Sequence, residues 1–446
     1  MKPAPDLPIN DLDVDHFLDR QRIGWHHIRV IALLILVMLI DSYDIFIVGA
    51  ILPFLASDMG VKPQAFTSIF ILQQLALLIG TFFIGPISDR FGRRRTLLVC
   101  TTCFTLLSFA TTQATTPAML IAIRCIASLF FASVIPNAIA LSSEIAPQRL
   151  RAGIVSLVFC GFTGGHFIEA FVQAYTLEHF GWQSAFWVGG GLGLMILALL
   201  YFYLPESIRF RARRDPADPR IGSALLAMDP GLNINAQTRF ILQDPVADTG
   251  RTSVSALFTK SRIAPTLLLW LAFLTSFIVN HLVGSWNTTV LHDMAGLSMQ
   301  HLAAGLSCST IAGIMGTATS GFVMDRFGAR NVVPIFFLGG ALAIGSLGYI
   351  DLGGADFLLA SALSGYFINS GLAAINALGA LIYPSSMRAT GVAWAAGAGR
   401  AGGMLGPAIG GVMLGLHSSV ATIYLVTAMP LVIAALAIMF IRRSTY

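Results

Sequence analysis

Long apolar runs separated by short polar segments dominate this chain. A transmembrane helix requires about 20 predominantly apolar residues. Twelve runs of this kind occur, centred near residues 40, 76, 104, 130, 163, 194, 276, 312, 341, 367, 402 and 430. Six precede and six follow one long polar stretch, residues 205–262. The pattern predicts an all-α polytopic membrane protein whose twelve transmembrane helices form two six-helix bundles.

The polar segments define the expected domains. We predict a tail at 1–27, a first bundle at 28–204, a linker loop at 205–262, a second bundle at 263–441 and a tail at 442–446. Composition supports a membrane protein, because 56% of the residues are hydrophobic and only 11% are charged, against about 25% charged in soluble domains. The polar N-terminal segment lacks the basic start and apolar core of a signal peptide.

Basic residues indicate the orientation. Of the 27 Lys and Arg, 24 fall on one side of the predicted helices, so the positive-inside rule places both termini and the linker in the cytoplasm of an inner (plasma) membrane. Basic loops of this kind contact lipid headgroups, and nothing resembles a nucleic-acid surface. The five cysteines lie within apolar runs, so we expect no disulfide framework, no metal site and no cofactor. We expect a monomer.

The two halves repeat each other. Residues 85–94 (GPISDRFGRR) recur as residues 321–330 (GFVMDRFGAR), and residues 147–152 (PQRLRA) recur as residues 384–389 (PSSMRA). Two motifs that recur at nearly the same offset, each at the end of a matching helix, indicate a duplicated six-helix unit. Two such units joined by a linker are typical of transporters.

With these motifs the chain resembles the major facilitator superfamily over essentially its whole length. The loop at residues 85–94 is that superfamily's best-known motif. Asp89 supplies an anion for a helix N-terminus, and the arginines can pair with a carboxylate such as Glu144. The resemblance implies a cytoplasmic conformational latch, formed by Gly85, Asp89, Arg90, Gly92, Arg93, Arg94, Asp325, Arg326 and Arg388.

Further stretches resemble one branch of that superfamily, the aromatic acid:proton symporters. They are residues 39–44 (LIDSYD), 136–144 (PNAIALSSE), 159–162 (FCGF) and the segment from Tyr383 to Arg400. The resemblance implies import of benzoate, hydroxybenzoates or related carboxylates. Ser42, Trp286, His166 and Glu169 depart from the pattern of this branch, and these departures cluster where a substrate would bind.

The ionisable residues inside the predicted helices are the candidates for function. A charge at the membrane centre costs about 2.5 to 3.5 kcal/mol on insertion scales, so these residues should face a water-filled cavity or each other. We expect Asp44 to pair with Arg124, either as a structural link or in proton coupling. The expected proton-coupling group is Asp41, Asp44, Arg124 and Glu144.

Arg400 has no counterpart in the first half, and its planar fork suits a carboxylate. We predict that it binds the substrate carboxylate, with a fixed internal partner as the alternative. His166 and Glu169 lie three residues apart, so they could relay a proton, contact a substrate hydroxyl or satisfy each other. Weaker candidates for the binding site are aromatic, imidazole and amide residues, namely Tyr43, Phe46, His281, Trp286, Asn287, Phe367, Asn369 and Asn376.

These observations predict a proton-coupled importer of a small organic acid that works by alternating access. The alternatives are a symporter for a sugar acid, an aliphatic carboxylate or phosphate, a drug or metabolite:proton antiporter, and a non-transporting sensor. The fifth predicted helix lacks the proline of drug antiporters, and the C-terminal tail lacks the Pro-Glu-Thr motif of sugar porters. No HExxH or GxSxG pattern occurs, so we do not expect an enzyme.

Overall fold

The computed structural model describes residues 11–21, 23–147, 150–229, 232, 234, 238–242, 257–259, 262–383 and 388–441. At the predicted latch positions Gly85, Asp89, Asp325 and Arg388 it describes the backbone alone. Parts of the second repeated motif, of the predicted N-terminal tail and of the predicted linker loop lie outside the described residues, as does the whole predicted C-terminal tail at 442–446.

Six spans form the first half of the chain. They are α2 (Trp25–Asp58), α3 (Thr67–Phe91), α4 (Arg93–Thr111), the pair α5 (Pro117–Phe131) and α6 (Val134–Ile145), α7 (Arg151–Tyr175), and α9 (Gln183–Tyr203). Two short helices, η1 (Pro63–Phe66) and α8 (Leu177–Phe180), lie in the connections.

The second half repeats this arrangement. Its spans are α12 (Ile263–Thr288), which continues as the π-helix η4 (Thr289–Met294), then α13 (Met299–Phe327), α14 (Ala329–Ser346), α15 (Ala355–Ile382), α16 (Arg388–Gly415) and α17 (Val420–Met439). Each of the twelve predicted centres falls within one span, which confirms the predicted helix order.

Ten of the spans are long and apolar enough to cross a membrane by length and composition alone. The other two are α4 and α16. The former begins with three arginines and contains several threonines, and the latter is rich in glycine, so both have low mean hydropathy. Their place in the bundles, and not their composition, identifies them as spans.

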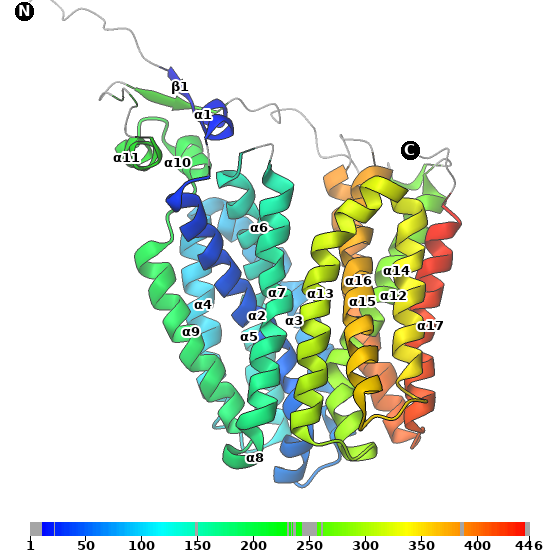
Figure 1. Cartoon of the computed structure of the whole chain (residues 1–446). Helices are drawn as coiled ribbons and strands as arrows, with labels where there is room; N and C mark the ends of the chain where they lie inside the picture. Colours follow the sequence, from blue (N-terminus) through cyan, green and yellow to red (C-terminus); the bar gives the residue numbers. More distant parts are fainter. Residues whose placement is uncertain are drawn as a thin grey trace, which may run out of the picture.

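The helices form two bundles that stand side by side (Figure 1). In the first half α2 packs against α7, and in the second half α12 packs against α16 and α13 against α15. The most extensive packing between the halves is that of α7 with α13, of α2 with α12, and of α3 with α16. The glycines of α16 allow close packing, because a Cβ at Gly402 or Gly406 would collide with backbone carbonyls of α12. These glycines therefore serve helix packing.

A small domain covers one end of the first bundle, which we call the linker end (Figure 1). Strand β1 (Asp11–Asp13) pairs in parallel with β2 (Arg239–Ile241), and α1 (Val14–Arg20), α10 (Ile208–Arg214) and α11 (Pro219–Met228) pack beside them. Their apolar side chains form a separate core, made of Val14, Leu18, Ile208, Ala212, Ile221, Leu225 and Phe240. The predicted N-terminal tail and linker loop therefore fold together.

Contacts between the halves gather at the opposite end, which we call the far end and which carries α8 and η4. The rings of Phe54 and His292 stack with centroids 6.1 Å apart. Gln173 on α7 donates a hydrogen bond to Thr288 Oγ1 at 3.4 Å. Gly49 and Gly284 bring the backbones of α2 and α12 together, since a Cβ at Gly49 would collide with the Gly284 carbonyl. The far end is therefore closed.

Candidate transport site

A cavity of about 140 Å³ lies between the two halves. The first half contributes Phe46 from α2 and Thr163, His166, Glu169 and Gln173 from α7. The second half contributes amides and hydroxyls, among them Asn280, Asn287, Thr288, Ser309, Thr310, Ser361, Ser364, Asn369 and Tyr424. No lysine or arginine occurs among the lining side chains that the structure describes. The cavity therefore combines uncharged polar groups with one ionisable pair.

That pair is His166 and Glu169, which lie three residues apart on the same face of α7. His166 Nδ1 and Glu169 Oε2 are 2.6 Å apart, and the side chains are 23% and 7% exposed. The predicted shared face is confirmed. Since a helix presents residues i and i+3 on one side, the regular geometry of α7 brings both groups to the cavity.

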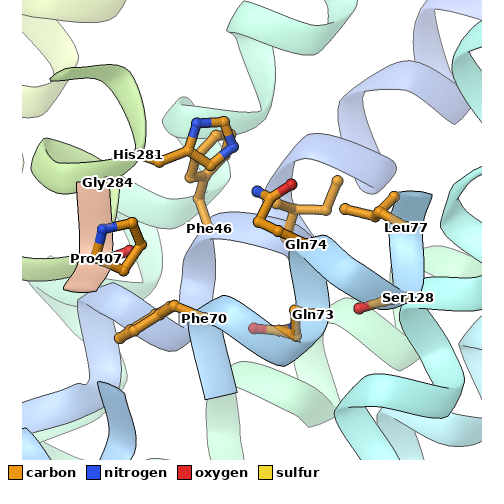
Figure 2. Close-up of a pocket in the computed structure, with 11 residues that line it drawn as sticks. Phe46, Phe70, Gln73, Gln74, Leu77, Ser128, His281, Gly284 and Pro407 are labelled. Carbon is orange, nitrogen blue, oxygen red and sulfur yellow. The ribbon is translucent and has the colours of Figure 1, made fainter. Parts of the chain in front are cut away.

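Phe46 separates this cavity from a small second chamber (Figure 2). The centroid of the Phe46 ring lies 5.0 Å from that of His166, which lines the cavity, and 5.9 Å from that of His281, which lines the chamber. The chamber holds about 20 Å³, room for a water molecule. Its polar lining comes from both halves, namely Gln73, Gln74, Ser128, His281 and Ser285.

The predicted ion pair between Asp44 and Arg124 is confirmed. Arg124 Nη1 donates to Asp44 Oδ2 at 2.9 Å, and Nη2 donates to the Asp44 backbone carbonyl at 2.5 Å. The two side chains are 2% and 0% exposed. Ser108 Oγ donates to Asp44 Oδ1 at 3.3 Å, and the guanidinium carbon lies 5.3 Å from the Phe186 ring centroid. The pair is buried within the first half and joins α5 to α2.

Asp41 differs from Asp44 although it lies one turn away on the same helix. It is fully buried, and neither carboxylate oxygen has a hydrogen-bond partner. Arg400 on α16, in the other half, is near enough for its positive charge to attract the Asp41 carboxylate. The two side chains do not form a hydrogen bond with each other. Arg400 is not among the residues that line the central cavity. The structure thus brings Arg400 towards Asp41.

The remaining predicted binding residues divide into two groups. Asn287, which accepts a hydrogen bond from the Tyr424 hydroxyl at 2.7 Å, and Asn369 line the cavity. Tyr43 is buried in the first bundle and donates to the Ala185 carbonyl at 2.6 Å, and Trp286 is buried against α16 and donates to the Pro407 carbonyl at 2.9 Å. Neither residue lines the cavity. Asn376 and Phe367 do not line it either. The Asn376 amide donates to the Leu372 carbonyl, and the Phe367 ring packs against Tyr366.

Glu144 lies with the latch and not with Asp44. Its carboxylate forms an ion pair with Arg93 Nη2 at 3.3 Å and accepts a hydrogen bond from Ser207 Oγ. The predicted pairing of a latch arginine with Glu144 is confirmed. Because Glu144 and this arginine meet at the linker end of α4 and α6, the structure does not bring Glu144 together with the other three proton-coupling candidates.

Glu206, which the sequence pattern did not single out, contacts the predicted latch residues. Its Oε1 accepts a hydrogen bond from the Arg94 backbone N–H at 3.1 Å, so this carboxylate occupies the N-terminus of α4. Gly92 precedes that helix with φ of +102°, and a Cβ there would collide with Glu206 Oε2. The guanidinium of Arg94 also donates to the Tyr201 carbonyl at 2.5 Å. The signal in the sequence was the Leu204-Pro-Glu-Ser207 segment.

The other described arginines of the latch make local contacts. The guanidinium carbon of Arg90 lies 5.6 Å from the Phe91 ring centroid, and that of Arg326 lies 5.7 Å from the Phe327 ring centroid. Gly328 has φ of +82° and repeats the role of Gly92 at the corresponding loop of the second half. The two copies of the motif therefore share their turn and their arginine–phenylalanine contact.

Comparisons with known proteins agree with this architecture. Residues 34–357 and 307–445 match the model of the Major Facilitator Superfamily. The chain belongs to this superfamily and is a multi-pass membrane transporter, as predicted. Among solved structures it resembles a D-xylose-proton symporter, with a TM-score of 0.72 and 16% identity over 94% of this chain and 98% of the other.

Curated relatives extend over nearly the whole length. The chain is 33% identical to the "Gallate transporter" of Pseudomonas putida over 98% of this chain and 96% of the relative. It is 32% identical to the "4-hydroxybenzoate transporter PcaK" of Pseudomonas aeruginosa over 98% of this chain and 97% of the relative. It is 25% identical to the "Benzoate transport protein" of Acinetobacter baylyi over 97% of this chain and 93% of the relative.

Proposed function

We propose that this transporter imports a small aromatic carboxylate together with protons by alternating access. The observation that carries the proposal is the central cavity, which both halves build jointly from an aromatic wall and polar groups. A site shared between two bundles can be exposed to either side when the bundles rock against each other. The names of the relatives, which include carriers of gallate, 4-hydroxybenzoate and benzoate, support an aromatic acid.

The lining suits an aromatic acid in two respects. Phe46 offers a ring face at the junction of both halves, where a substrate ring can stack. The His281 ring lies beside Phe46, and Arg400 is near enough to His281 for its charge to act on the imidazole. A guanidinium in this position can take the substrate carboxylate once a rearrangement frees it from Asp41.

Proton coupling is proposed for Asp41. A buried carboxylate without a hydrogen-bond partner is costly when ionised and becomes neutral when it takes a proton. Its opposite charge, Arg400, belongs to the other half, so protonation of Asp41 weakens an attraction between the bundles and releases Arg400 for the substrate. The proton and the substrate carboxylate would thus both bind at the Asp41–Arg400 pair. Asp44 and Arg124 hold the helix that carries Asp41 in place.

The energetics of proton symport favour import. The positive-inside rule places the linker end in the cytoplasm of the plasma membrane. An acid with one carboxylate that crosses with one proton carries no net charge. The pH gradient alone then drives accumulation, at about 1.4 kcal/mol for each pH unit.

Uptake into proteoliposomes with an imposed pH gradient tests the proposal. The panel comprises labelled benzoate, hydroxybenzoates, phenylpropionates, a sugar acid, sugars and phosphate. We expect accumulation of one or more aromatic acids only when the outside is acidic, and collapse of the accumulation when a protonophore is added. Accumulation of a non-aromatic solute in their place, or aromatic uptake that ignores the pH gradient, would refute the proposal.

A further inference from the structure

A third cavity, here called the linker pocket, lies at the linker end and holds about 320 Å³. Phe91 at the end of α3 and Arg94 and Arg95 in the first turn of α4 form one part of its lining. The other lining residues lie between positions 206 and 220, on the segment that leads from α9 through α10 to the start of α11. The linker pocket shares no lining residue with the central cavity or the chamber. The proposed transport chemistry therefore makes no use of it.

Arginine side chains dominate the polar lining of the linker pocket. Five arginines and three carboxylates leave a net charge of +2 on the described lining: Arg94, Arg95, Arg211, Arg214 and Arg220 against Glu206, Asp215 and Asp218. Arg211 and Arg214 are three residues apart and so share a face of α10. Arg213 of the same helix does not line the pocket. The helix thus presents two of its arginines to one cavity.

The three carboxylates of the pocket already serve the local backbone. Glu206 accepts a backbone N–H of the first turn of α4 at 3.1 Å. Asp215 and Asp218 each accept the backbone N–H group two residues further along the chain, at 3.0 and 2.9 Å. These bonds explain why the three acids lie here without any reference to the arginines.

The arginines have far fewer partners. Arg94 donates to the Tyr201 carbonyl. Within the part of the chain that the structure describes, no side-chain hydrogen bond or ion pair involves the other four, Arg95, Arg211, Arg214 and Arg220. Five guanidinium groups thus line one cavity with most of their donors unused, although each group offers five N–H donors.

Topology alone does not explain this arrangement. The positive-inside rule accounts for arginines at this end of the spans. It does not account for their convergence on one cavity from three helices, α4, α10 and α11. Like charges that share a cavity repel each other, and a bound anion would turn this repulsion into attraction.

A phosphate group has the chemistry that this lining would recognise. A phosphate monoester carries about 1.5 to 2 negative charges near pH 7, which matches the surplus of the lining. The planar fork of arginine forms paired hydrogen bonds with phosphate oxygens. The volume lies at the lower end of small-molecule sites, which span about 300 to 1,000 Å³. The ring of Phe91, 49% exposed, offers apolar surface to the remainder of such an ester.

We propose that the linker pocket binds the phosphate group of a phosphate ester between the start of α4 and the arginines of α10 and α11. A soluble phosphorylated metabolite and a lipid headgroup with a terminal phosphate both offer this chemistry. A ligand held by both sets of arginines ties the small domain to the first bundle beside the predicted latch, and it stabilises the folded protein in proportion to its affinity. The site does not depend on which substrate the transporter carries.

Calorimetric titration of the purified, detergent-solubilised transporter with ribose 5-phosphate tests the proposal. Ionic strength is held constant with chloride, because exposed charges are screened by salt. We expect a saturable site for ribose 5-phosphate and a rise in the unfolding temperature, with no such effect of ribose. The lipid source is tested in nanodiscs that contain phosphatidic acid or only phosphatidylcholine. Phosphatidic acid that displaces ribose 5-phosphate from the pocket would identify a headgroup as a ligand, and undiminished binding of ribose 5-phosphate in both nanodiscs would identify a soluble ester.

Variants locate the binding in the linker pocket. Arg211→Gln/Arg214→Gln and, separately, Arg95→Gln should each weaken ribose 5-phosphate binding at least about tenfold, as expected for the loss of charge-assisted hydrogen bonds. Arg213→Gln is the matched control, since it removes one charge from α10 outside the pocket, and it should change the affinity by less than about threefold.

The unfolding temperature without ligand shows whether each variant is folded, and Arg95→Gln alone decides the question if the double variant is not. The proposal is overturned if neither ribose 5-phosphate nor phosphatidic acid binds the wild type. It is overturned equally if both bind the folded pocket variants as tightly as they bind the wild type. Uptake of aromatic acids is measured separately, so failure here leaves the proposed function untouched.

Discussion

Arg124 binds Asp44 twice, once through the Asp44 side chain at 2.9 Å and once through the Asp44 backbone carbonyl at 2.5 Å. The second bond matters because a backbone carbonyl cannot lose its acceptor character when a proton arrives. Arg124 therefore fixes the position of this turn of α2, and Asp41 lies one turn away without such a partner. Two aspartates three residues apart thus have opposite surroundings.

Removal of the Asp44 charge should damage both the stability and the coupling of the transporter. Asp44→Asn leaves the fully buried guanidinium of Arg124 without its counter-ion, and loss of one partner from a buried pair costs about 3 to 5 kcal/mol. We expect a clear drop in the thermal unfolding temperature of the purified protein. In proteoliposomes, proton-driven accumulation should be abolished while some exchange without a gradient remains.

The double variant Asp44→Asn/Arg124→Gln provides the control, because it removes both charges. It should recover most of the lost thermal stability without recovering accumulation. Full accumulation by Asp44→Asn alone would show that Asp44 has no part in coupling.

Asp41→Asn should have the opposite effect on stability. Its carboxylate has no hydrogen bond to lose, and a neutral amide is less costly to bury than an ionised carboxylate. We expect thermal stability equal to or above that of the wild type, together with loss of accumulation driven by a pH gradient and retained exchange of substrate. An Asp41→Asn protein that still accumulates substrate would rule out Asp41 as the proton acceptor.

The sequence predicted the helix order and the Asp44–Arg124 pair for physical reasons. Apolar runs of sufficient length have one stable form in a membrane, and a buried charge requires a partner that few residues can supply. It was harder to predict which side chains of a helix face the cavity. Trp286 and Asn376 belong to helices that build the site, yet Trp286 packs against Gly410 of α16 and Asn376 does not line the cavity.

Long-range pairing of polar segments could not be predicted from the pattern. Phe240 lies in β2 and Val14 begins α1 directly after β1, both in short segments with too few apolar residues to suggest a core. The parallel pairing of β1 with β2 brings these segments together, and their side chains share one core. The role of Glu206 likewise depends on the approach of α9 to α4, which brings residues 94 and 206 together. Spacing along the chain carries no signal for contacts of this kind.

Glu206 should govern the rate of switching and leave recognition intact. Glu206→Gln removes the anion at the N-terminus of α4, an interaction worth about 0.3 to 1 kcal/mol at an exposed helix end and up to about 2 when partly buried. Because the latch lies at the linker end, the equilibrium affinity for substrate should change by less than about threefold. Initial uptake rates should fall severalfold. A large loss of affinity with normal turnover would contradict the assignment of Glu206 to the latch.

Arg400 is the intramembrane cation that the second half places opposite Asp41. Its guanidinium is planar and can form two parallel hydrogen bonds with a carboxylate, which gives the sharpest prediction. If Arg400 binds the substrate carboxylate, Arg400→Lys should fail nearly as badly as Arg400→Ala, because a point ammonium cannot reproduce two parallel hydrogen bonds. Loss of the charged pair should cost about 2 to 5 kcal/mol of binding. The loss of binding is measured from the thermal protection that an aromatic acid and its uncharged amide give to the purified protein. The acid alone should protect the wild type, and neither ligand should protect Arg400→Ala strongly. A variant that still distinguishes acid from amide as the wild type does would leave Arg400 as the internal partner of Asp41, with the carboxylate bound elsewhere.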